Sequence, residues 1–474
     1  LGLGKGDRAA ILALNSDRYY EFFFGTAWAG GVFVPINIRL APPEVAYWLN
    51  DSEAKILFID AMFAPMLKAL EGSIPHVEQV IYLGDDAAPE GMHSYEALVA
   101  GAEPVPDADC GYEDLAGLFY TGGTTGRSKG VMLSHRNLVV NSYNTISVLH
   151  YENDARYLHA PPMFHIADCV AVFGQTQIGN SHYFIPAFTP DGTLDAIQRW
   201  QITDTLLVPT MVNMTVNHPS VADYDLSSLR HLAYGASPMP EAVIMRAMQV
   251  MPDVQFYHAY GQTECAPLTS VNGPESHVFD GPMANMYRSC GRSAPGVMVE
   301  IRDENDQEVP RGEVGEICVR GANVMQGYWK LPELTAETLR GGWLHSGDGG
   351  YMDENGYIYV VDRVKDMIIS GGENIYSAEV ESAVQMFPAV AECAVIGIPD
   401  EKWGEAVHAI VRLKEGESAT EEAIITHCRE QIAGFKCPRS VAFVTEALPL
   451  SGAGKILKTE LRKPYWEDKG KAVN

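Results

Sequence analysis

The 474-residue chain lacks an apolar run long enough to cross a lipid bilayer, and it lacks a secretory signal segment. These absences argue against an integral membrane protein and predict a cytoplasmic one. No low-complexity tract and no internal repeat is present, which argues against a disordered or solenoid protein. The sequence begins at Leu1 with a pattern typical of a domain interior, so we expect its extreme N-terminus to be missing.

Paired cysteines are also lacking. The eight cysteines form no CxxC pair and share no zinc-like spacing with histidine. We interpret them as scattered thiols of a protein from a reducing compartment. This excludes a disulfide scaffold and a structural zinc site of the common kinds.

Basic residues are scarce. The 34 Lys and Arg are outnumbered by 61 Asp and Glu, which gives a formal net charge of -27. A chain this acidic repels nucleic acid and anionic membrane surfaces, so neither is an expected partner. If its substrates are anions, their site needs backbone N–H donors, a metal ion and a few well-placed cations.

Strand and helix patterns alternate over most of the chain. A length of 474 residues is too great for one compact core and predicts at least two domains. The alternation is typical of doubly wound α/β sheets covered by helices on both faces. The first elements that we expect are strands at 9–14, 32–36, 55–59 and 80–83, and helices at 17–29 and from Pro42 onward.

The pattern changes twice towards the C-terminus. Strand-rich segments at 297–301, 315–319 and 357–361 predict a small β-rich subdomain. After Arg363 a smaller α+β unit follows. Its expected elements are helices at 377–386 and 421–432 and strands at 391–398, 406–413 and 440–444. We therefore predict an N-terminal domain over 1–362 and a C-terminal domain over 363–474.

The most informative segment is LFYTGGTTGRSKGV, residues 118–131. An apolar strand leads into a loop of Thr and Gly that ends on Lys129, and a helix is expected after Ser134. Glycines let backbone N–H groups approach a phosphate closely, and Thr hydroxyls add donors. The segment is not a Walker loop, because Gly130 follows Lys129 where Ser or Thr is required. A plain glycine-rich turn is the alternative.

This segment resembles the phosphate loop of the adenylate-forming superfamily, which includes acyl-CoA synthetases, peptide-synthetase adenylation domains and firefly luciferase. Further stretches resemble its motifs in family order. They are YGQTE (260–264), GANVMQGYW (321–329), WLHSGD (343–348), YVVDRVKD (359–366) and PLSGAGK (449–455). The resemblance covers essentially the whole chain and implies an ATP-dependent acid–CoA ligase with a mobile C-terminal domain.

The resemblance implies a nucleotide site. Tyr260 would stack on adenine, Thr263 would bind the α-phosphate, and Asp348 would accept the ribose hydroxyls with help from Arg363. Glu264, with Thr121, would hold Mg2+ between the phosphates, since Mg2+ prefers one or two carboxylates plus phosphate oxygens. The other expected ATP or AMP contacts are Thr121, Gly122, Gly123, Thr124, Thr125, Gly126, Lys129, Gly235, Ala236, Ser237 and Gly261.

The C-terminal motifs imply two alternating half-reactions. Lys455 would bridge the substrate carboxylate and the α-phosphate during adenylation. Lys365 matches the hinge, and Ser370, Gly371 and Gly372 would give the pantetheine arm of coenzyme A room to pass. At three motif positions the chain departs from the family pattern. Gly122 stands where Ser or Thr is usual, Ser128 where Pro is usual and Ser346 where Thr is usual.

The acyl pocket is the least defined part of the site. The resemblance gives it His165, Met211 and Gly235, with walls at 165–179, 208–214 and 235–237. We interpret His165 as a pocket gate rather than a general base, since the sequence offers no carboxylate to orient it other than Asp168. The mixture of apolar and polar side chains favours a medium or longer fatty acid, with an aryl acid such as ferulate as the alternative.

Two other functions stay open at the level of sequence. One is an adenylating enzyme with a different acceptor, and the other is a nucleotide-binding protein without turnover. The carboxylic acid, ATP and coenzyme A are the expected small-molecule partners. The family often forms homodimers, so a homodimer is an open prediction.

Overall fold

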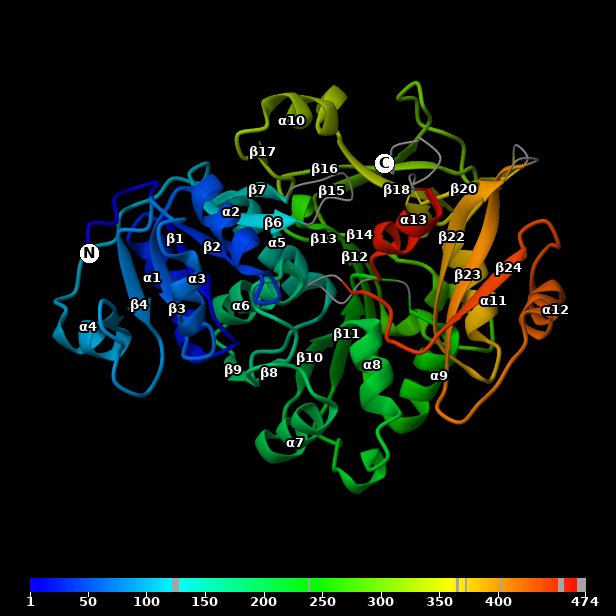
Figure 1. Ribbon diagram of the computed structural model, residues 1–474, viewed down its shortest axis with the longest axis horizontal. Coiled ribbons are helices and arrows are strands. Elements are labelled where there is room, and N and C mark those ends of the chain that lie inside the picture. Colours follow the sequence, from blue (N-terminus) through cyan, green and yellow to red (C-terminus); the bar gives the residue numbers. More distant parts are fainter. Residues whose placement is uncertain are drawn as a thin grey trace.

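The computed structural model describes residues 1–121, 128–237, 239–363, 366–370, 373–400, 403–450 and 456–466. The blue N-terminal strands lie at one end of the molecule and the orange C-terminal sheet lies at the other, with the green segments between them (Figure 1). Within these ranges, no helix has both the length and the apolar character needed to span a membrane.

The first sheet is mostly parallel and has the order β17-β7-β6-β2-β1-β3-β4-β5. Only β7 and β17 run antiparallel to their neighbours. Its strands are β1 (Arg8–Leu12), β2 (Val32–Pro35), β3 (Ala54–Ile59), β4 (Gln79–Tyr82), β5 (His93–Ser94), β6 (Leu115–Thr121), β7 (Lys129–Ser134) and β17 (Gly327–Tyr328). Its connections carry α1 (Asp17–Trp28), α2 (Pro42–Ser52), α3 (Leu67–Leu70) and α4 (Tyr95–Gly101).

The second sheet has the order β14-β13-β12-β11-β10-β8-β9, and its strands from β8 to β12 are parallel. Its strands are β8 (Arg156–His159), β9 (Ser181–Phe184), β10 (Asp204–Leu207), β11 (His231–Gly235), β12 (Gln255–Gly261), β13 (Leu268–Asn272) and β14 (Arg292–Ser293). The helices of this part are α5 (His135–Val148), α6 (Ile166–Gln177), α7 (Pro190–Trp200), α8 (Pro209–Val216) and α9 (Glu241–Val250).

A third, antiparallel sheet of order β15-β16-β18-β19 follows in the chain. Its elements are β15 (Val297–Arg302), β16 (Gly315–Gly321), α10 (Pro332–Thr338), β18 (Leu344–Met352) and β19 (Ile358–Arg363). Short 3-10 helices connect several elements: η1 (Ala64–Met66), η2 (Val221–Asp223), η3 (Thr263–Cys265), η4 (Pro274–Ser276), η5 (Met286–Arg288) and η6 (Arg340–Gly342).

The C-terminal sheet has the order β21-β20-β23-β22, with β24 also paired to β23. Its buried side chains, such as Val380, Val395 and Val407, form a hydrophobic cluster of their own. The elements are β20 (Ile368–Ser370), β21 (Glu373–Ile375), α11 (Ser377–Gln385), β22 (Val390–Asp400), β23 (Gly404–Leu413), α12 (Glu421–Gln431), β24 (Ser440–Val444) and α13 (Lys458–Trp466). The predicted fold class, a large α/β part followed by a small α+β part, is confirmed.

Local chemistry explains where the first helices begin. The Ser16 hydroxyl accepts the backbone N–H of Tyr19 at 3.1 Å and so caps α1. Helix α2 begins at Pro42, whose fixed φ suits a first helical turn. One face of α2, with Val45 and Trp48, is buried. These caps and periodicities are readable in the sequence, and the predicted elements of this region are confirmed.

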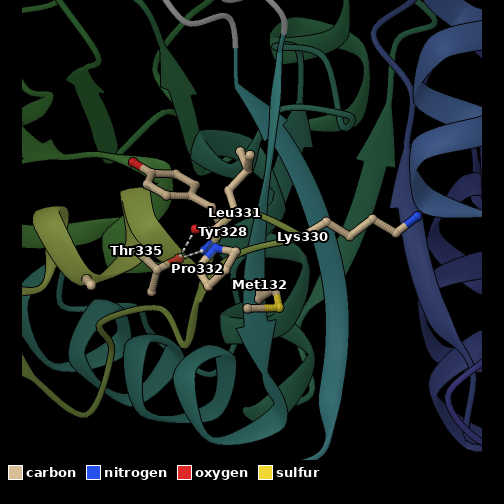
Figure 2. Close-up of a pocket in the computed structure, with 7 residues that line it drawn as sticks. Met132, Tyr328, Lys330, Leu331, Pro332 and Thr335 are labelled. Atoms are coloured by element: carbon tan, nitrogen blue, oxygen red, sulfur yellow. Dashed lines mark hydrogen bonds between the residues drawn. The ribbon is translucent and has the colours of Figure 1, made fainter.

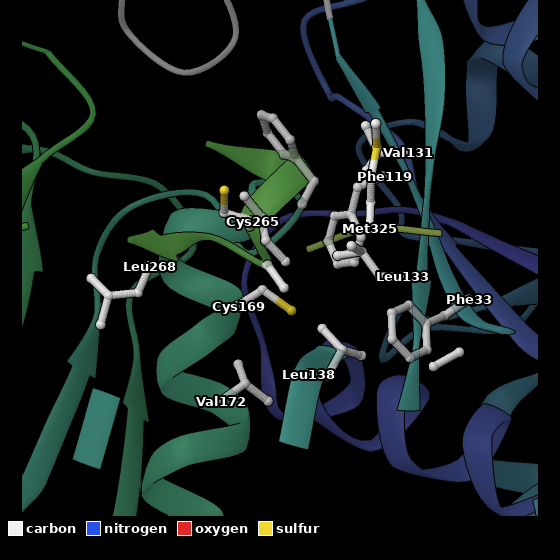
Figure 3. Close-up of a cluster of buried hydrophobic side chains, with 14 of the residues drawn as sticks. Phe33, Phe119, Val131, Leu133, Leu138, Cys169, Val172, Cys265, Leu268 and Met325 are labelled. Carbon is white, nitrogen blue, oxygen red and sulfur yellow. The ribbon is translucent and has the colours of Figure 1, made fainter. Parts of the chain in front are cut away.

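One hydrophobic cluster joins the first two sheets (Figure 3). Phe33 and Phe119 enter it from the first sheet, and Cys169 and Val172 enter it from α6. Cys265 enters it directly after a glutamate of the predicted magnesium site. Close packing of this kind holds the ends of β6, β7 and β12 in a fixed relation, which matters because the predicted nucleotide residues lie there.

A buried chain of polar groups lies between α6 and the edge of the second sheet. His159 donates from Nδ1 to Asp168 Oδ2 at 2.7 Å, and its Nε2 lies 2.8 Å from His182 Nδ1. Burial, with a smaller contribution from His159, lowers the pKa of His182 to about 3. Burial likewise lowers the pKa values of His258 and His277 to about 4.

These lowered pKa values predict that the protein loses stability as the pH falls below 6.5. The unfolded chain binds protons at these histidines between pH 6.5 and 4, whereas the folded chain does not, so the free energy of unfolding is highest above pH 6.5. Each such group contributes about 1.4 kcal/mol per pH unit in that window. Denaturant unfolding at pH 7.5 and 5.0 measures the difference. We expect His182→Gln to reduce it, whereas His150→Gln, at an exposed histidine, should leave it unchanged.

Candidate active site

The two strands that flank the predicted phosphate loop form an antiparallel pair. Strands β6 and β7 pair antiparallel, and Thr121 lies opposite Lys129 at the mouth of the loop. Val131 and Leu133 alternate into the core, which explains why the chain returns as a strand before the expected helix, α5, begins after Ser134. The glycine-rich loop thus precedes a strand, not a helix N-terminus. Gly122, Gly123, Thr124, Thr125 and Gly126 lie outside the described residues.

Lys129 takes part in a three-residue cluster beside this pair of strands. Its Nζ lies 4.9 Å from the centroid of the Tyr328 ring. The Tyr328 hydroxyl donates to Glu264 Oε1 at 2.7 Å. Burial, and then the negative charge of Glu264, raises the pKa of Tyr328, so this hydroxyl stays a donor. The cluster brings a predicted phosphate ligand and a predicted magnesium ligand to the same place.

Tyr328 is a site residue to which the sequence analysis assigned no role, although it belongs to the quoted GYW stretch. Tyr328 lies in β17, and Thr335 of α10 fixes its backbone. The Thr335 hydroxyl accepts the Tyr328 N–H at 2.9 Å and donates to the Leu331 carbonyl at 2.8 Å (Figure 2). A shallow groove of about 430 Å3 lies beside this turn. It is lined by Met132, Tyr328, Lys330, Leu331, Pro332, Thr335 and Ala336. Lys330 points away from it and pairs with Glu53.

Glu264 lies in η3, where the chain is tightly anchored. The next residue, Cys265, is fully buried, and the Glu264 carbonyl accepts the Met325 N–H at 2.9 Å. The Tyr328 hydroxyl donates to Oε1 of the Glu264 carboxylate. Carboxylate and hydroxyl oxygens are donors that suit Mg2+, and Thr121, at the end of β6, offers such a hydroxyl.

Tyr260 and Asp348 meet in the structure. Tyr260 lies near the end of β12, and its hydroxyl donates to Asp348 Oδ2 of β18 at 2.7 Å. Burial, reinforced by the charge of Asp348, raises the pKa of Tyr260. A ring with a carboxylate at its hydroxyl end presents both a stacking face and an acceptor, which are the two features that a nucleoside requires.

Close backbone contacts explain two glycines of the predicted nucleotide site. A Cβ at Gly235 would lie 2.1 Å from the Ala259 carbonyl oxygen, and one at Gly261 would lie 1.9 Å from the Pro267 carbonyl oxygen. Ala236 then adopts φ +69°, a turn conformation, and leads to Ser237. Neighbouring backbone lies so close at the ends of β11 and β12 that only glycine fits at either position.

Several predicted residues have limited structural descriptions. Thr263 is buried in η3 next to Glu264. Arg363 pairs through its backbone with Asp348, between β19 and β18, and its side chain lies outside the described residues. Ser370 is buried at the end of β20. Lys365, Gly371, Gly372 and Lys455 also lie outside the described residues.

The suggestion that Asp168 orients His165 is wrong. Asp168 is fully buried and its carboxylate is hydrogen-bonded to His159. His165 instead caps α6, with its Nδ1 accepting the Ala167 N–H at 3.2 Å. Spacing along one helical turn suggested the first pairing, but Asp168 faces the second sheet. This favours the interpretation of His165 as a gate.

The residues of the predicted acyl-pocket wall differ in burial. Met211 is buried and lies with Ala236 in one hydrophobic cluster. Met214 is 52% exposed, and Gln177 is also exposed. Phe173 packs on Phe33, with ring centroids 6.1 Å apart, in the cluster between the sheets. The residues of the predicted wall therefore lie on different faces of α6 and α8, because successive residues of a helix point in different directions.

Comparison with known proteins identifies the family. The model of the AMP-binding enzymes matches residues 1–329, and that of the AMP-binding enzyme C-terminal domain matches residues 379–455. The chain belongs to this family. The superfamily inferred from the motifs and the enzyme class, an AMP-forming acid–thiol ligase, are thereby confirmed.

The similar proteins differ in the acid that their names give as substrate. The chain is 41% identical to a feruloyl-CoA synthase of Amycolatopsis sp, over 98% of this chain and 90% of that one. It is 36% identical to the fatty acid–[acyl-carrier-protein] ligase ScoC of Streptomyces coeruleorubidus, over 100% and 89%. The anthranilate CoA ligase AuaEII, solved with anthranoyl-AMP, aligns with a TM-score of 0.89 at 28% identity, over 98% and 88%.

Proposed function

We propose that this enzyme converts a carboxylic acid, ATP and coenzyme A into an acyl-CoA, AMP and pyrophosphate through an acyl-adenylate. The observation that carries the proposal is the convergence of two residue pairs around the end of β12. Tyr260 meets Asp348 there, and Glu264 meets Tyr328 beside Lys129. One pair suits a nucleoside and the other suits its phosphates.

The chemistry explains why these groups are needed. A bare carboxylate is a poor electrophile, because its leaving group would be oxide. Attack of the carboxylate on the α-phosphorus forms a mixed anhydride and releases pyrophosphate, and the thiol of coenzyme A then displaces AMP. Two anions react in the first step, so Lys129 near the phosphates and Lys455 near the carboxylate would offset their charge.

The residues present fit a magnesium ion held by Glu264 and Thr121. When bound, Mg2+ would neutralise charge on the phosphate oxygens. The protein's own contribution is the orientation of Glu264, since the Tyr328 hydroxyl donates to one carboxylate oxygen at 2.7 Å and so restrains the carboxylate.

The second half-reaction uses the C-terminal domain, with its hinge proposed at Lys365. Lys365→Pro is expected to slow thioester formation about tenfold and adenylation about twofold at most, because proline freezes φ where the chain must swivel. Separate assays of pyrophosphate release and of thioester formation from supplied acyl-adenylate measure the two steps. Lys365→Ala is the control, because it removes the same side chain but leaves φ free to change. An equal loss of both steps in Lys365→Pro contradicts the hinge assignment.

For the acid, we propose a compact aryl acid of the hydroxycinnamate type. Two observations support it. Val172 and Phe173 fill the core between the sheets, so α6 offers a long acyl chain little room there. The feruloyl-CoA synthase is also more similar in sequence than ScoC. The medium or longer fatty acid expected from the sequence remains the second candidate, favoured by the similarity to ScoC.

A panel assay tests this choice. Purified enzyme is given ATP, Mg2+ and coenzyme A with ferulate, benzoate, octanoate or palmitate, and AMP and acyl-CoA are quantified. We expect ferulate to give the highest kcat/KM. Preference for octanoate or palmitate would establish the fatty acid instead. Acyl-adenylate captured by hydroxylamine without any acyl-CoA would indicate a different acceptor, and no AMP with any acid would refute the proposed function.

A further inference from the structure

A bulge in β18 presents Asp348. In the pairing of β16 with β18, Glu316 lies opposite Gly349 and Cys318 lies opposite His345. One residue separates the pair on β16, whereas three residues, 346–348, separate the pair on β18. The two extra residues loop out of the ladder, and Gly347 adopts φ +73° within them. Bulges of this kind re-aim a side chain and are common beside active sites.

The Glu316 carboxylate closes this bulge. Its Oε1 accepts the Gly347 N–H at 2.9 Å, which replaces the strand partner that the bulge removes. Its Oε2 accepts from His345 Nδ1 at 2.8 Å and from the Arg340 guanidinium at 3.4 Å. Two of the donors, from Arg340 and His345, precede the bulge and the third, from Gly347, lies inside it. The carboxylate thus ties the bulge to the strand before it, while Glu316 pairs in the ladder with Gly349 after it.

The 346–348 bulge leads directly into the proposed nucleoside site. Asp348 follows Gly347 directly, its N–H binds the Ser346 hydroxyl at 3.0 Å, and its carboxylate receives the Tyr260 hydroxyl. Glu316 itself contacts the bulge, with no contact to Tyr260 among the described residues. Its effect on the site therefore passes through the backbone of Gly347.

We propose that Glu316 is a positioning residue that holds the 346–348 bulge so that Asp348 faces the ribose hydroxyls of ATP. This inference rests on the proposed nucleotide site. Without the acceptor, the Gly347 N–H is unsatisfied and the bulge relaxes, so the aim of Asp348 is lost while the rest of the site stays intact.

The same side chains could be taken for a metal site, since ligand atoms of Glu316, Cys318 and His345 lie within 4.8 Å of one another. The hydrogen bonds favour the positioning role. Both Glu316 oxygens already accept protein donors, and the Arg340 cation lies against one of them. Burial also raises the pKa of the Cys318 thiol to about 12, which disfavours the thiolate that a metal needs.

A binding cycle with deoxynucleotides tests the proposal without any acid. Calorimetry compares Mg-ATP with its 2′-deoxy and 3′-deoxy analogues. The wild-type protein is expected to bind ATP about tenfold more tightly, because a carboxylate accepts the ribose hydroxyls. In Glu316→Ala the preference for ATP over its deoxy analogues should fall to about twofold, because a displaced Asp348 no longer accepts the ribose hydroxyls. Glu316→Gln keeps an acceptor for Gly347 and should restore most of it.

Glu300→Ala is the matched control, because Glu300 is a carboxylate of the same sheet that pairs with Arg302. It should discriminate like the wild type. If Glu316→Ala does not fold, Arg340→Met, which removes a half-exposed partner of the same carboxylate, should still halve the discrimination.

The outcomes separate the two proposals. Failure of the wild-type protein to bind ATP would refute the proposed function. Binding with ribose discrimination that Glu316→Ala leaves unchanged would refute only the positioning role. Stoichiometric zinc in the purified protein, with discrimination lost on chelation, would also overturn it in favour of a metal site.

Discussion

Replacing Lys455 by alanine is expected to slow acyl-adenylate formation by ~10²–10³-fold. In the adenylation step a carboxylate approaches an anionic phosphate, and the transition state spreads additional charge over the phosphoryl oxygens. A single ammonium group placed there stabilises this charge in a water-poor site. The same variant should convert supplied acyl-adenylate and coenzyme A into acyl-CoA at nearly the wild-type rate, because Lys455 is proposed to act only in the first step.

Two assays on one preparation measure this split. Pyrophosphate release reports adenylation, and the disappearance of supplied acyl-adenylate reports thioester formation. Lys463→Ala is a suitable control, since Lys463 is half-exposed and pairs with Glu460 in the same helix. Equal loss of both half-reactions in Lys455→Ala would show that the lysine has another role.

Replacing Glu264 by glutamine is expected to slow pyrophosphate release about 10²-fold. The amide keeps the shape of the side chain and can still accept the Tyr328 hydroxyl, so the local packing is preserved. The negative charge is lost, however, and with it the affinity for Mg2+ between the phosphates. The Mg2+ concentration needed for half-maximal rate should therefore rise.

A magnesium titration of the initial rate at saturating ATP checks this expectation. Glu241→Gln serves as the control, because that carboxylate pairs with Arg288 at the surface. Tyr328→Phe should give a smaller loss, since it removes the hydrogen bond and leaves the charge. If Glu264→Gln keeps the wild-type rate and magnesium dependence, the metal-binding role is wrong.

Local patterns were sufficient for much of the fold. Helix α1 begins next to a serine cap and ends just before paired glycines, and β3 is apolar apart from Lys55, so both could be placed from neighbouring residues alone. The strand–helix alternation then implied parallel sheets. The order of the strands in each sheet could not be derived in this way, because it depends on contacts between distant segments.

The candidate site shows the same division. The motif around Tyr260 and Glu264 was recognisable in the sequence, because a run of chemically suited residues is local. The partners of these residues were not. Tyr328 lies 64 residues after Glu264, and Asp168 turned towards His159 instead of the nearby His165. The positions of a few side chains, not their identities, separated correct from incorrect assignments.

The amino-acid sequence by itself determined the enzyme class and the acidity of a chain that needs local cations for anionic substrates, and it predicted the phosphate, adenine and ribose residues. Only the tertiary structure decided which oxygen of Glu264 is taken by Tyr328, how the 346–348 bulge is held by Glu316, and that Phe173 belongs to the core. The reason is physical. Propensities, caps and motifs act between residues close in the chain, whereas hydrogen-bond partners and close packing are set by segments that meet only after folding.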